Sequence, residues 1–229
     1  MLNRTDFKMS TRDFVYETIR ESIMTLDLPP GSAISEKEIA EELEVSRTPV
    51  REAFLRLTED ELLMVLPQRG SFVTLIDLDH VEEARFLREQ AEVGIIRLAC
   101  DSFNDYCLQQ LEINVEKQKQ AKKTEDEKTL FVLDKEFHRL LAEGTKKLRV
   151  WKVIQKMDTH SNRLRKLSME LKLNWDQLVE HHGEMVSAIK TKDCERAEVL
   201  VRTHLGLLQY DQKALRLEHP EYFSKEQRL

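Results

Sequence analysis

The chain has 229 residues and a formal net charge of −6, and its 3 cysteines are scattered without CxxC spacing. This composition excludes a disulfide-stabilised scaffold. No apolar run approaches the roughly 20 residues that span a bilayer, which excludes a membrane-spanning helix. The first residues are polar and lack the apolar core of a signal peptide, so we expect a soluble cytoplasmic protein. With only 6 glycines and 5 prolines, the fold should be mainly α-helical, and the length allows two domains.

The chain should begin with a loose arm over residues 1–10 and an amphipathic helix over residues 11–25. Val15, Ile19 and Ile23 follow one another at four-residue spacing and form one apolar stripe on that helix. The stripe indicates that this helix packs against the elements that follow it.

Residues 28–72 have the pattern of a winged helix-turn-helix. Short helical periods are followed by two β-prone runs around a glycine-containing turn. The expected elements are helices over residues 36–43 and 47–59, and strands over residues 63–66 and 71–74 joined by a hairpin at residues 67–70. Such a motif places its second helix in the major groove of DNA. We therefore predict that residues 1–76 form a DNA-binding domain.

The start of the second helix carries side chains that suit DNA. Arg47, Thr48 and Arg51 lie at or near that start, and the rigid donor fork of arginine suits guanine or phosphate. Ser46 stands at the N-cap position, where its hydroxyl can bond the free N–H groups of the first turn. On the hairpin, Arg69 is placed to reach a phosphate or the minor groove.

The positive charge of this domain is local. Residues 1–76 contain 9 Lys and Arg against 14 Asp and Glu, so the domain is acidic overall. DNA binding must therefore rely on a focused basic patch rather than on bulk attraction. Non-specific affinity for DNA should be weak and sensitive to salt.

The stretch LPPGSAISEKEIAEELEVSRTPVREAF resembles the signature of the GntR superfamily of bacterial transcription regulators. The resemblance covers about residues 11–76. Two departures stand out, because Glu44 replaces the usual glycine of the helix-turn-helix corner and Glu61 replaces the usual glycine before the wing. The resemblance implies DNA contacts at six positions, which are Lys37, Ser46, Arg47, Thr48, Arg51 and the wing-tip Gly70.

Residues 77–229 should form a second, all-helical domain of six or seven helices. Helical periods are expected near residues 78–101, 104–123, 127–144, 148–168, 174–190 and 194–216. The second of these is rich in Lys, Gln and Glu, so we expect a solvated outer helix. The tail after Glu218 lacks a strong period and should be loosely attached.

Four residues of this domain form a candidate metal site. Asp134 and His138 are four apart and share one helix face, and His181 and His204 lie beside apolar stripes on later helices. A histidine turned into a helical core needs partners for its nitrogens. One carboxylate and three imidazoles that converge in a bundle would bind Zn²⁺, Ni²⁺ or Mn²⁺. His182 points about 100° away from His181 and replaces it only if the register is shifted by one residue.

The second domain is similar to the FCD effector domain of the FadR branch of the GntR superfamily, over about residues 78–216. Members of that branch carry a D-x-x-x-H pair, an E-H pair and a histidine in the final helix. The similarity implies that the metal ligands are Asp134, His138, His181 and His204. An arginine in the first helix of such domains binds a ligand carboxylate, which implies an effector-binding role for Arg88. A surface ion pair with Glu92 is the alternative, and Arg85, Arg163 and Arg165 are other candidates for the cavity.

These features predict a DNA-binding transcription regulator rather than an enzyme. It would act as a homodimer on a palindromic operator in double-stranded DNA, and a small carboxylate effector at the metal site would control its affinity for DNA. In one alternative the metal ion itself is the signal. In another the cluster activates water in a hydrolase, although the sequence has no HExxH motif and only Glu180 and Glu184 stand near as general bases.

Overall fold

The computed structural model describes residues 9–224, and these form two compact units. Within the described residues, the first unit comprises residues 9–76 and 221–224, and the second runs from Asp77 to Pro220. We expected all of residues 77–229 in the helical domain. Residues 221–224 instead belong to the first unit, where buried Phe223 forms a parallel bridge with Ile76. Most of the arm expected over residues 1–10 lies outside the described residues.

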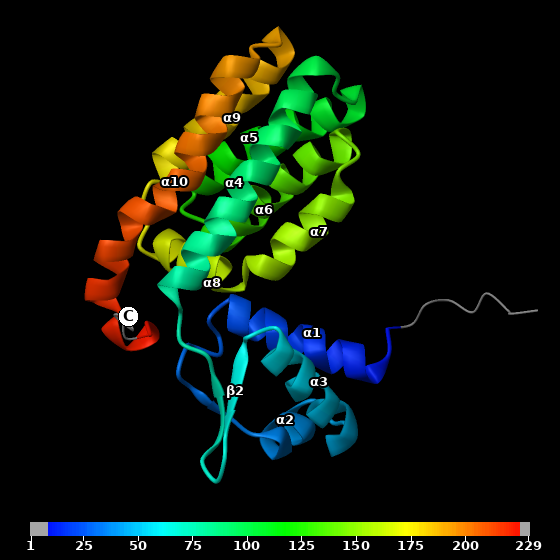
Figure 1. Cartoon of the computed structure of the whole chain (residues 1–229), viewed down its shortest axis with the longest axis vertical. Helices are drawn as coiled ribbons and strands as arrows, with labels where there is room; N and C mark the ends of the chain where they lie inside the picture. Colours follow the sequence, from blue (N-terminus) through cyan, green and yellow to red (C-terminus); the bar gives the residue numbers. More distant parts are fainter. Residues whose placement is uncertain (1–8, 225–229) are drawn as a thin grey trace, which may run out of the picture. The chain divides into compact units, whose positions relative to one another are not determined.

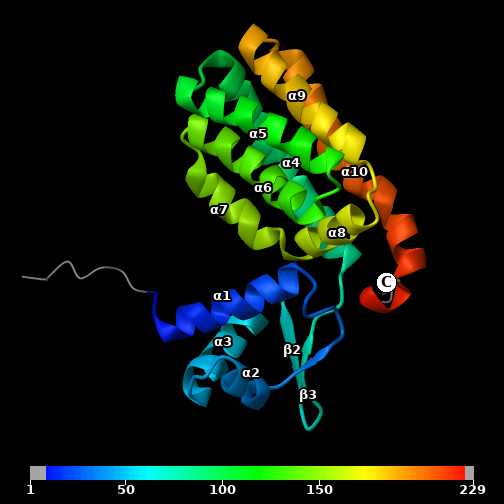
Figure 2. The same cartoon turned by 180° about the vertical axis from the view of Figure 1, so that it is seen from behind.

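The first unit is a winged helix-turn-helix, as the sequence predicted. Its elements are α1 (Thr11–Met24), β1 (Ala33–Ile34), α2 (Glu36–Glu42), α3 (Arg47–Glu59), β2 (Leu63–Leu66) and β3 (Gly70–Val73). The strands form an antiparallel sheet in the order β1-β3-β2, in which Met64 pairs with Phe72 and Leu66 with Gly70. The two-residue strand β1 was not expected. Figures 1 and 2 show the β2–β3 hairpin projecting from the three helices of this unit.

The core of this unit fixes the orientation of α3. It joins the apolar stripes predicted for α1 and α3, which consist of Val15, Ile19, Ile23, Val50, Phe54 and Leu57. Arg56 of α3 also pairs with Asp13 of α1 at 2.7 Å, and its guanidinium lies 3.9 Å from the ring centre of Tyr16. Because one face of α3 is held in this way, its other face is left to solvent.

The second unit is a helical bundle, and the mainly α fold class is confirmed. Its helices are α4 (Leu78–Asp101), α5 (Asp105–Lys123), α6 (Glu127–Gly144), α7 (Leu148–Met157), α8 (Thr159–Glu170), α9 (Trp175–Thr191) and α10 (Cys194–Glu218), before a 3₁₀ turn at Pro220–Tyr222. Figure 1 shows α4, α5, α6, α9 and α10 packed alongside one another. The single helix expected over residues 148–168 is two helices, α7 and α8, which meet at Asp158.

The interior of the bundle is apolar but encloses buried polar side chains. Helix α5, which we expected to be a solvated outer helix, packs against α6 and α9 and buries Asn114 and Gln118 on its inner face. Arg88 and Glu92 are likewise buried on α4. Among the described residues, no helix is both long enough and apolar enough to cross a membrane.

Candidate functional site

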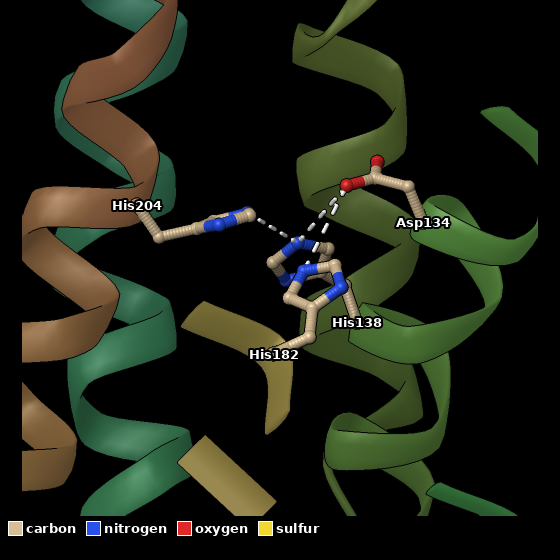
Figure 3. A group of neighbouring side chains, drawn as sticks. All are labelled: Asp134, His138, His182 and His204. Carbon is tan, nitrogen blue, oxygen red and sulfur yellow. Dashed lines mark hydrogen bonds and ion pairs between the residues drawn. The ribbon is translucent and has the colours of Figure 1, made fainter. Parts of the chain in front are cut away.

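Four side chains from three helices converge on one buried point in the bundle (Figure 3). Asp134 and His138 come from α6, His182 from α9 and His204 from α10, and their donor atoms all lie within 4.8 Å of one another. Nε2 of His138 is 3.2 Å from Nε2 of His204. Oδ1 of Asp134 is 3.9 Å from Nε2 of His138 and 3.8 Å from Nε2 of His182. We refer to these four residues as the His/Asp cluster.

His182, and not His181, completes this cluster, which corrects the expectation from sequence. The two residues are adjacent on α9, so their side chains point about 100° apart. His182 is fully buried and its ring stacks on Phe137 at 3.8 Å between centres. His181 is partly exposed, and its ring centre is 6.0 Å from that of His204. The helix register therefore assigns His182 to the position that we expected for His181.

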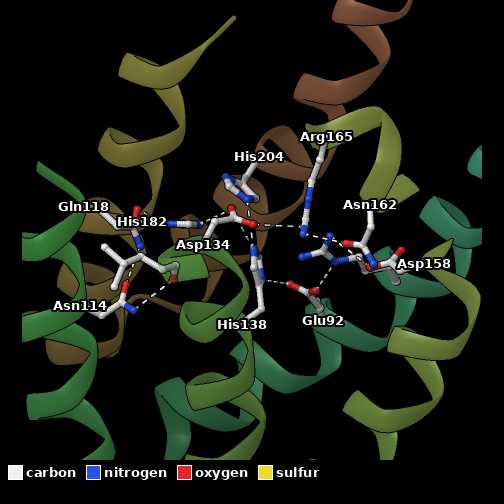
Figure 4. A network of polar contacts seen from close by, with 12 residues as sticks. Glu92, Asn114, Gln118, Asp134, His138, Asp158, Asn162, Arg165, His182 and His204 are labelled. Atoms are coloured by element: carbon white, nitrogen blue, oxygen red, sulfur yellow. Dashed lines mark hydrogen bonds and ion pairs between the residues drawn. The ribbon is translucent and has the colours of Figure 1, made fainter. Parts of the chain in front are cut away.

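A chain of hydrogen bonds determines which nitrogen of His182 faces the cluster (Figure 4). It starts at the backbone carbonyl of Leu133, which can only accept and which accepts from Nδ2 of Asn114 at 3.1 Å. Oδ1 of Asn114 then accepts from Nε2 of Gln118 at 2.6 Å, which leaves Oε1 of Gln118 2.8 Å from Nδ1 of His182. Because an amide oxygen only accepts, Nδ1 carries the proton and Nε2 of His182 presents a lone pair to the cluster.

His138 is oriented by a carboxylate. Its Nδ1 lies 2.6 Å from Oε2 of Glu92, and Oε1 of Glu92 accepts from Nε of Arg88 at 2.6 Å. Burial works against ionisation of Glu92, but Arg88 and His138 outweigh it and lower the pKa of Glu92 to about 2. The ionised carboxylate can only accept, so Nδ1 of His138 donates and Nε2 faces the cluster. A carboxylate behind an imidazole in this way is typical of metal-binding histidines.

The other members of the cluster also have the protonation states that binding of a cation requires. Burial holds the pKa values of His182 and His204 well below the usual range, so both imidazoles are neutral. Burial would raise the pKa of Asp134, but the guanidinium of Arg165 outweighs it and holds that pKa below its usual value. Nη1 of Arg165 lies 3.2 Å from Oδ2 of Asp134, so Oδ1 is the oxygen that faces the histidines.

The cluster fits a divalent transition metal ion. Nitrogen and oxygen ligands bind such an ion at about 2.0–2.2 Å, so ligand atoms lie about 3–4 Å from one another. The separations of 3.2, 3.8 and 3.9 Å agree with that range. Nε2 of His182 is buried and has no hydrogen-bond partner among residues 9–224. Three imidazole nitrogens and one carboxylate oxygen suit Zn²⁺, Ni²⁺ or Mn²⁺.

A cavity between α4, α8, α9 and α10 adjoins the cluster and reaches Arg88. Arg88 is 5% exposed, so it does not form the surface ion pair that we considered as an alternative. Its Nε contacts Glu92 and its Nη1 lies 3.5 Å from Asp158, where α7 and α8 meet. Its Nη2 is buried and has no hydrogen-bond partner in the described part of the chain. Arg88 therefore keeps one donor for a ligand.

The other candidate arginines differ in their surroundings. Arg165 lines the cavity beside Asp134. Arg85 also lines it, but the carboxylates of Glu82 and Glu89 hold its guanidinium. Arg163 does not line the cavity, and its Nη2 lies 3.1 Å from Nδ1 of His160, which is buried. Arg88 and Arg165 are thus the arginines best placed to meet an anion.

The residues expected to contact DNA all lie on the surface of the winged unit. They are Lys37, Ser46, Arg47, Thr48, Arg51, Arg69 and Gly70. Arg47 and Arg51 are four apart on α3 and so share one helix face. Among the described residues neither Arg47 nor Arg51 forms an ion pair, whereas Nζ of Lys37 lies 3.8 Å from Oε1 of Glu41. The start of α3 thus presents two exposed guanidinium groups to solvent.

The turns around α3 depart from the usual side-chain chemistry. Ser46 is the N-cap of α3, but its hydroxyl makes no capping bond, contrary to our expectation. That hydroxyl and the first N–H groups of the helix are left to an external acceptor such as a phosphate. Glu44 and Glu61 adopt left-handed backbone, with φ of 53° and 58°. Glycine is the residue that favours this conformation, which explains why it is usual at both positions.

Comparisons with known proteins agree with this architecture. The chain matches the FCD domain over residues 83–207 and the gntR family of bacterial regulatory proteins over residues 11–73. The HTH-type transcriptional repressor RspR of Escherichia coli K12 is 31% identical, with 93% of each chain covered. An uncharacterized HTH-type transcriptional regulator of Streptomyces ambofaciens is 33% identical, over 96% of this chain and 92% of its own.

A solved structure supports the same fold. E. coli McbR/YncC superposes with a TM-score of 0.74, at 23% identity, over 93% of this chain and all of the other. The protein therefore belongs to the GntR family of bacterial regulatory proteins, as a member with an FCD domain, and its relatives are HTH-type transcription regulators.

Proposed function

We propose that this regulator binds operator DNA as a homodimer and that a small organic acid controls its affinity for DNA. The acid would be held beside a divalent metal ion in the helical unit. The observation that carries the proposal is the pairing of a buried His/Asp cluster with an arginine-lined cavity, in a chain that also carries an exposed recognition helix. Asp134, His138, His182 and His204 would hold the metal ion, which when bound supplies a positive centre for a carboxylate.

The DNA-binding half of the proposal rests on α3. Arg47 and Arg51 are exposed and share a face, and the first turn of α3 lacks a side-chain cap. A helix start with free N–H groups and two arginines suits phosphates and base edges in the major groove. A single winged domain buries little DNA surface, so two copies on a palindromic site would give specific binding.

The effector half rests on the charges around the cavity. At the inner end of the cavity, Arg88 and Arg165 contribute two positive charges, and the carboxylates of Glu92, Asp134 and Asp158 contribute at most three negative charges, because burial raises the pKa of Asp158. A divalent cation in the cluster therefore leaves this inner end with an excess of positive charge. Excess positive charge in a buried site is costly unless an anion balances it. A bound carboxylate would supply that balance.

Chain connectivity suggests how the two functions are linked. Helix α4, which carries Arg88, begins two residues after Ile76, and α10, which carries His204, leads through Pro220 to Phe223. Ile76 and Phe223 pair within the winged unit. Two of the helices that line the cavity are therefore tied by short segments to the same bridge. An effector that favours one arrangement of α4 and α10 would bias the winged unit, provided that it binds the two arrangements with different affinity.

The proposal is tested with a DNA duplex that the protein itself selects from random sequence. Fluorescence anisotropy would follow DNA binding by zinc-loaded protein, by chelator-treated protein, and by zinc-loaded protein with a panel of carboxylic acids. We expect at least one acid to change the affinity for DNA in the zinc-loaded protein and not after chelation. If zinc alone switches DNA binding and no acid has an effect, the metal is the signal and the effector proposal is wrong.

A further inference from the structure

We infer that the effector is a monocarboxylic acid with an apolar body, and not a dicarboxylate. This inference rests on the proposed function, because it specifies the acid that the cavity beside the His/Asp cluster accepts. The cavity has a polar inner end and a mostly apolar outer part. A ligand that complements both must carry its charge at one end only.

The inner end offers hydrogen-bond donors that lack partners. Nη2 of Arg88 and Oγ of Ser161 are both buried, both residues line the cavity, and neither atom has a hydrogen-bond partner among the described residues. Each residue is 5% exposed. Leaving a buried donor unpaired is costly, so such groups indicate an absent acceptor. One carboxylate has two oxygens and can accept from both donors.

The rest of the lining is mainly aliphatic, and its polar members include Arg85, Asn174, Gln209, Asp211 and Gln212. The aliphatic side chains come from α4, α8, α9, the segment between α8 and α9, and α10, and include Val81, Met169, Leu173, Leu178, Leu205 and Leu208. Leu173, Leu178 and Leu208 are only partly buried, whereas Arg88 and Asp134 at the inner end are almost inaccessible. The carboxylate end of a ligand would therefore lie inward and its carbon chain outward. Each methylene buried there should raise affinity about fourfold.

A carboxylate of the protein faces the outer part as well. Asp211 lines the same cavity and is 6% exposed, and it accepts hydrogen bonds from Ser168 Oγ at 2.5 Å and from the amide of Asn174. It lies seven residues beyond His204 on α10, about 10 Å along the helix axis. A ligand with a second carboxylate at its far end would bring that charge among leucines and toward Asp211. Desolvation and like-charge repulsion both oppose this.

Hexanoate and adipate are matched probes, because both have six carbons and differ only in the second carboxylate. Isothermal titration of the zinc-loaded full-length protein would compare them, with butyrate as a shorter acid. We expect hexanoate to bind at least tenfold tighter than adipate and tighter than butyrate. Asp211→Asn should reduce the difference in affinity between hexanoate and adipate.

Ser161→Ala tests the assignment of the inner end. Loss of a hydrogen bond to a charged group should lower the affinity for hexanoate about tenfold or more. The zinc content and the melting temperature without ligand should stay unchanged. Ser187→Ala, at an exposed position on α9, is the control and should have no effect.

The outcomes separate this inference from the function on which it rests. If adipate binds as tightly as hexanoate, or tighter, the apolar monocarboxylate is wrong but control by an organic acid stands. If the zinc-loaded protein binds none of the three acids and no acid in the wider panel alters DNA binding, the proposed function fails as well. Equal hexanoate affinity of Ser161→Ala and the parent protein would overturn the role of Ser161.

Discussion

Gln118 of α5 accepts a hydrogen bond from Nδ1 of His182 on α9 at 2.8 Å. The direction of that bond is fixed by a series of hydrogen bonds that runs from Gln118 through Asn114 to the backbone carbonyl of Leu133, which can only accept. This series leaves Nε2 of His182 as a lone pair that faces the His/Asp cluster. Gln118 is not a member of the His/Asp cluster, yet it fixes which nitrogen of His182 carries the proton. Such outer partners orient the ligands of a metal site and tune its affinity.

Replacing Gln118 should therefore weaken metal binding. Gln118→Leu removes the acceptor for His182, and we expect zinc affinity to fall about 10- to 100-fold. Gln118→Glu keeps an acceptor at that position and should lose less. Gln120→Leu, at an exposed position on the same helix, is the control. Competition with a chromogenic chelator measures the affinity, and circular dichroism checks the fold. Equal affinities for Gln118→Leu and Gln120→Leu would show that the relay has no role.

The adjacent histidines of α9 provide a test of the ligand set. His182→Gln should reduce the amount of zinc bound per chain, or lower the affinity for zinc by several orders of magnitude, because the substitution removes a buried ligand. His181→Gln should retain full zinc, because that side chain stays outside the cluster. Elemental analysis of the two purified variants after dialysis distinguishes them. The reverse result, with zinc lost only from His181→Gln, would restore the original sequence-based assignment.

The sequence contained the information that separates the two histidines. Val179, His182, Val186 and Ile189 follow one another at spacings of three, four and three, and all four are buried, so His182 continues an apolar stripe that His181 does not join. The E-H pair of the family resemblance assigns His181 instead, and that assignment is wrong because it ignores this stripe. Gln118 gives a similar signal, because it replaces an apolar residue on the buried face of α5. A polar residue at a core position of an amphipathic helix indicates a buried network.

Other features depend on tertiary contacts that local sequence does not encode. The bounds expected for α4 and α6 agree with the structure because Asp77 and Asp126 cap them and the apolar periods are regular. The break between α7 and α8 has no proline or glycine to mark it. Asp158 lies at that break, buried and near Arg88 on α4, so the interruption belongs to the packing of the bundle. The return of the tail at Phe223 is likewise a contact between distant parts of the chain.

Arg51→Ala should weaken operator binding. If Arg51 meets a phosphate, loss of that contact lowers the slope of log affinity against log salt by about one; if it meets a guanine, about 1–3 kcal/mol of discrimination at that base pair is lost. Arg12→Ala removes the same charge from an exposed position on α1 and is the control. Anisotropy titrations at several salt concentrations measure both quantities. If both variants bind the operator as the parent protein does, α3 does not read DNA through Arg51.

Tyr16 should make the winged unit sensitive to alkaline pH. Its hydroxyl donates to Asp60, and burial together with Asp60 raises the pKa of Tyr16 to about 12 from a usual value of 10. A raised pKa in the folded state contributes stability below pH 10, and this contribution is lost as the pH rises toward 12. The free energies of unfolding of the parent protein and of Tyr16→Phe, measured by denaturation, should therefore converge as the pH rises from 10 to 12. A difference in stability that stays constant over this interval would contradict the raised pKa.

Glu44→Gly should stabilise the winged unit. Glu44 holds a φ of 53° in the corner between α2 and α3, and a non-glycine residue in the left-handed region costs about 1 kcal/mol. Glycine removes that cost but loses more conformational entropy on folding, so we expect a net gain of about 0.5 kcal/mol. Glu52→Gly, at an exposed position in the middle of α3, removes the same charge and should cost about 1 kcal/mol. Urea denaturation gives both values, and destabilisation by both substitutions would mean that the side chain of Glu44 stabilises the corner more than its backbone strains it.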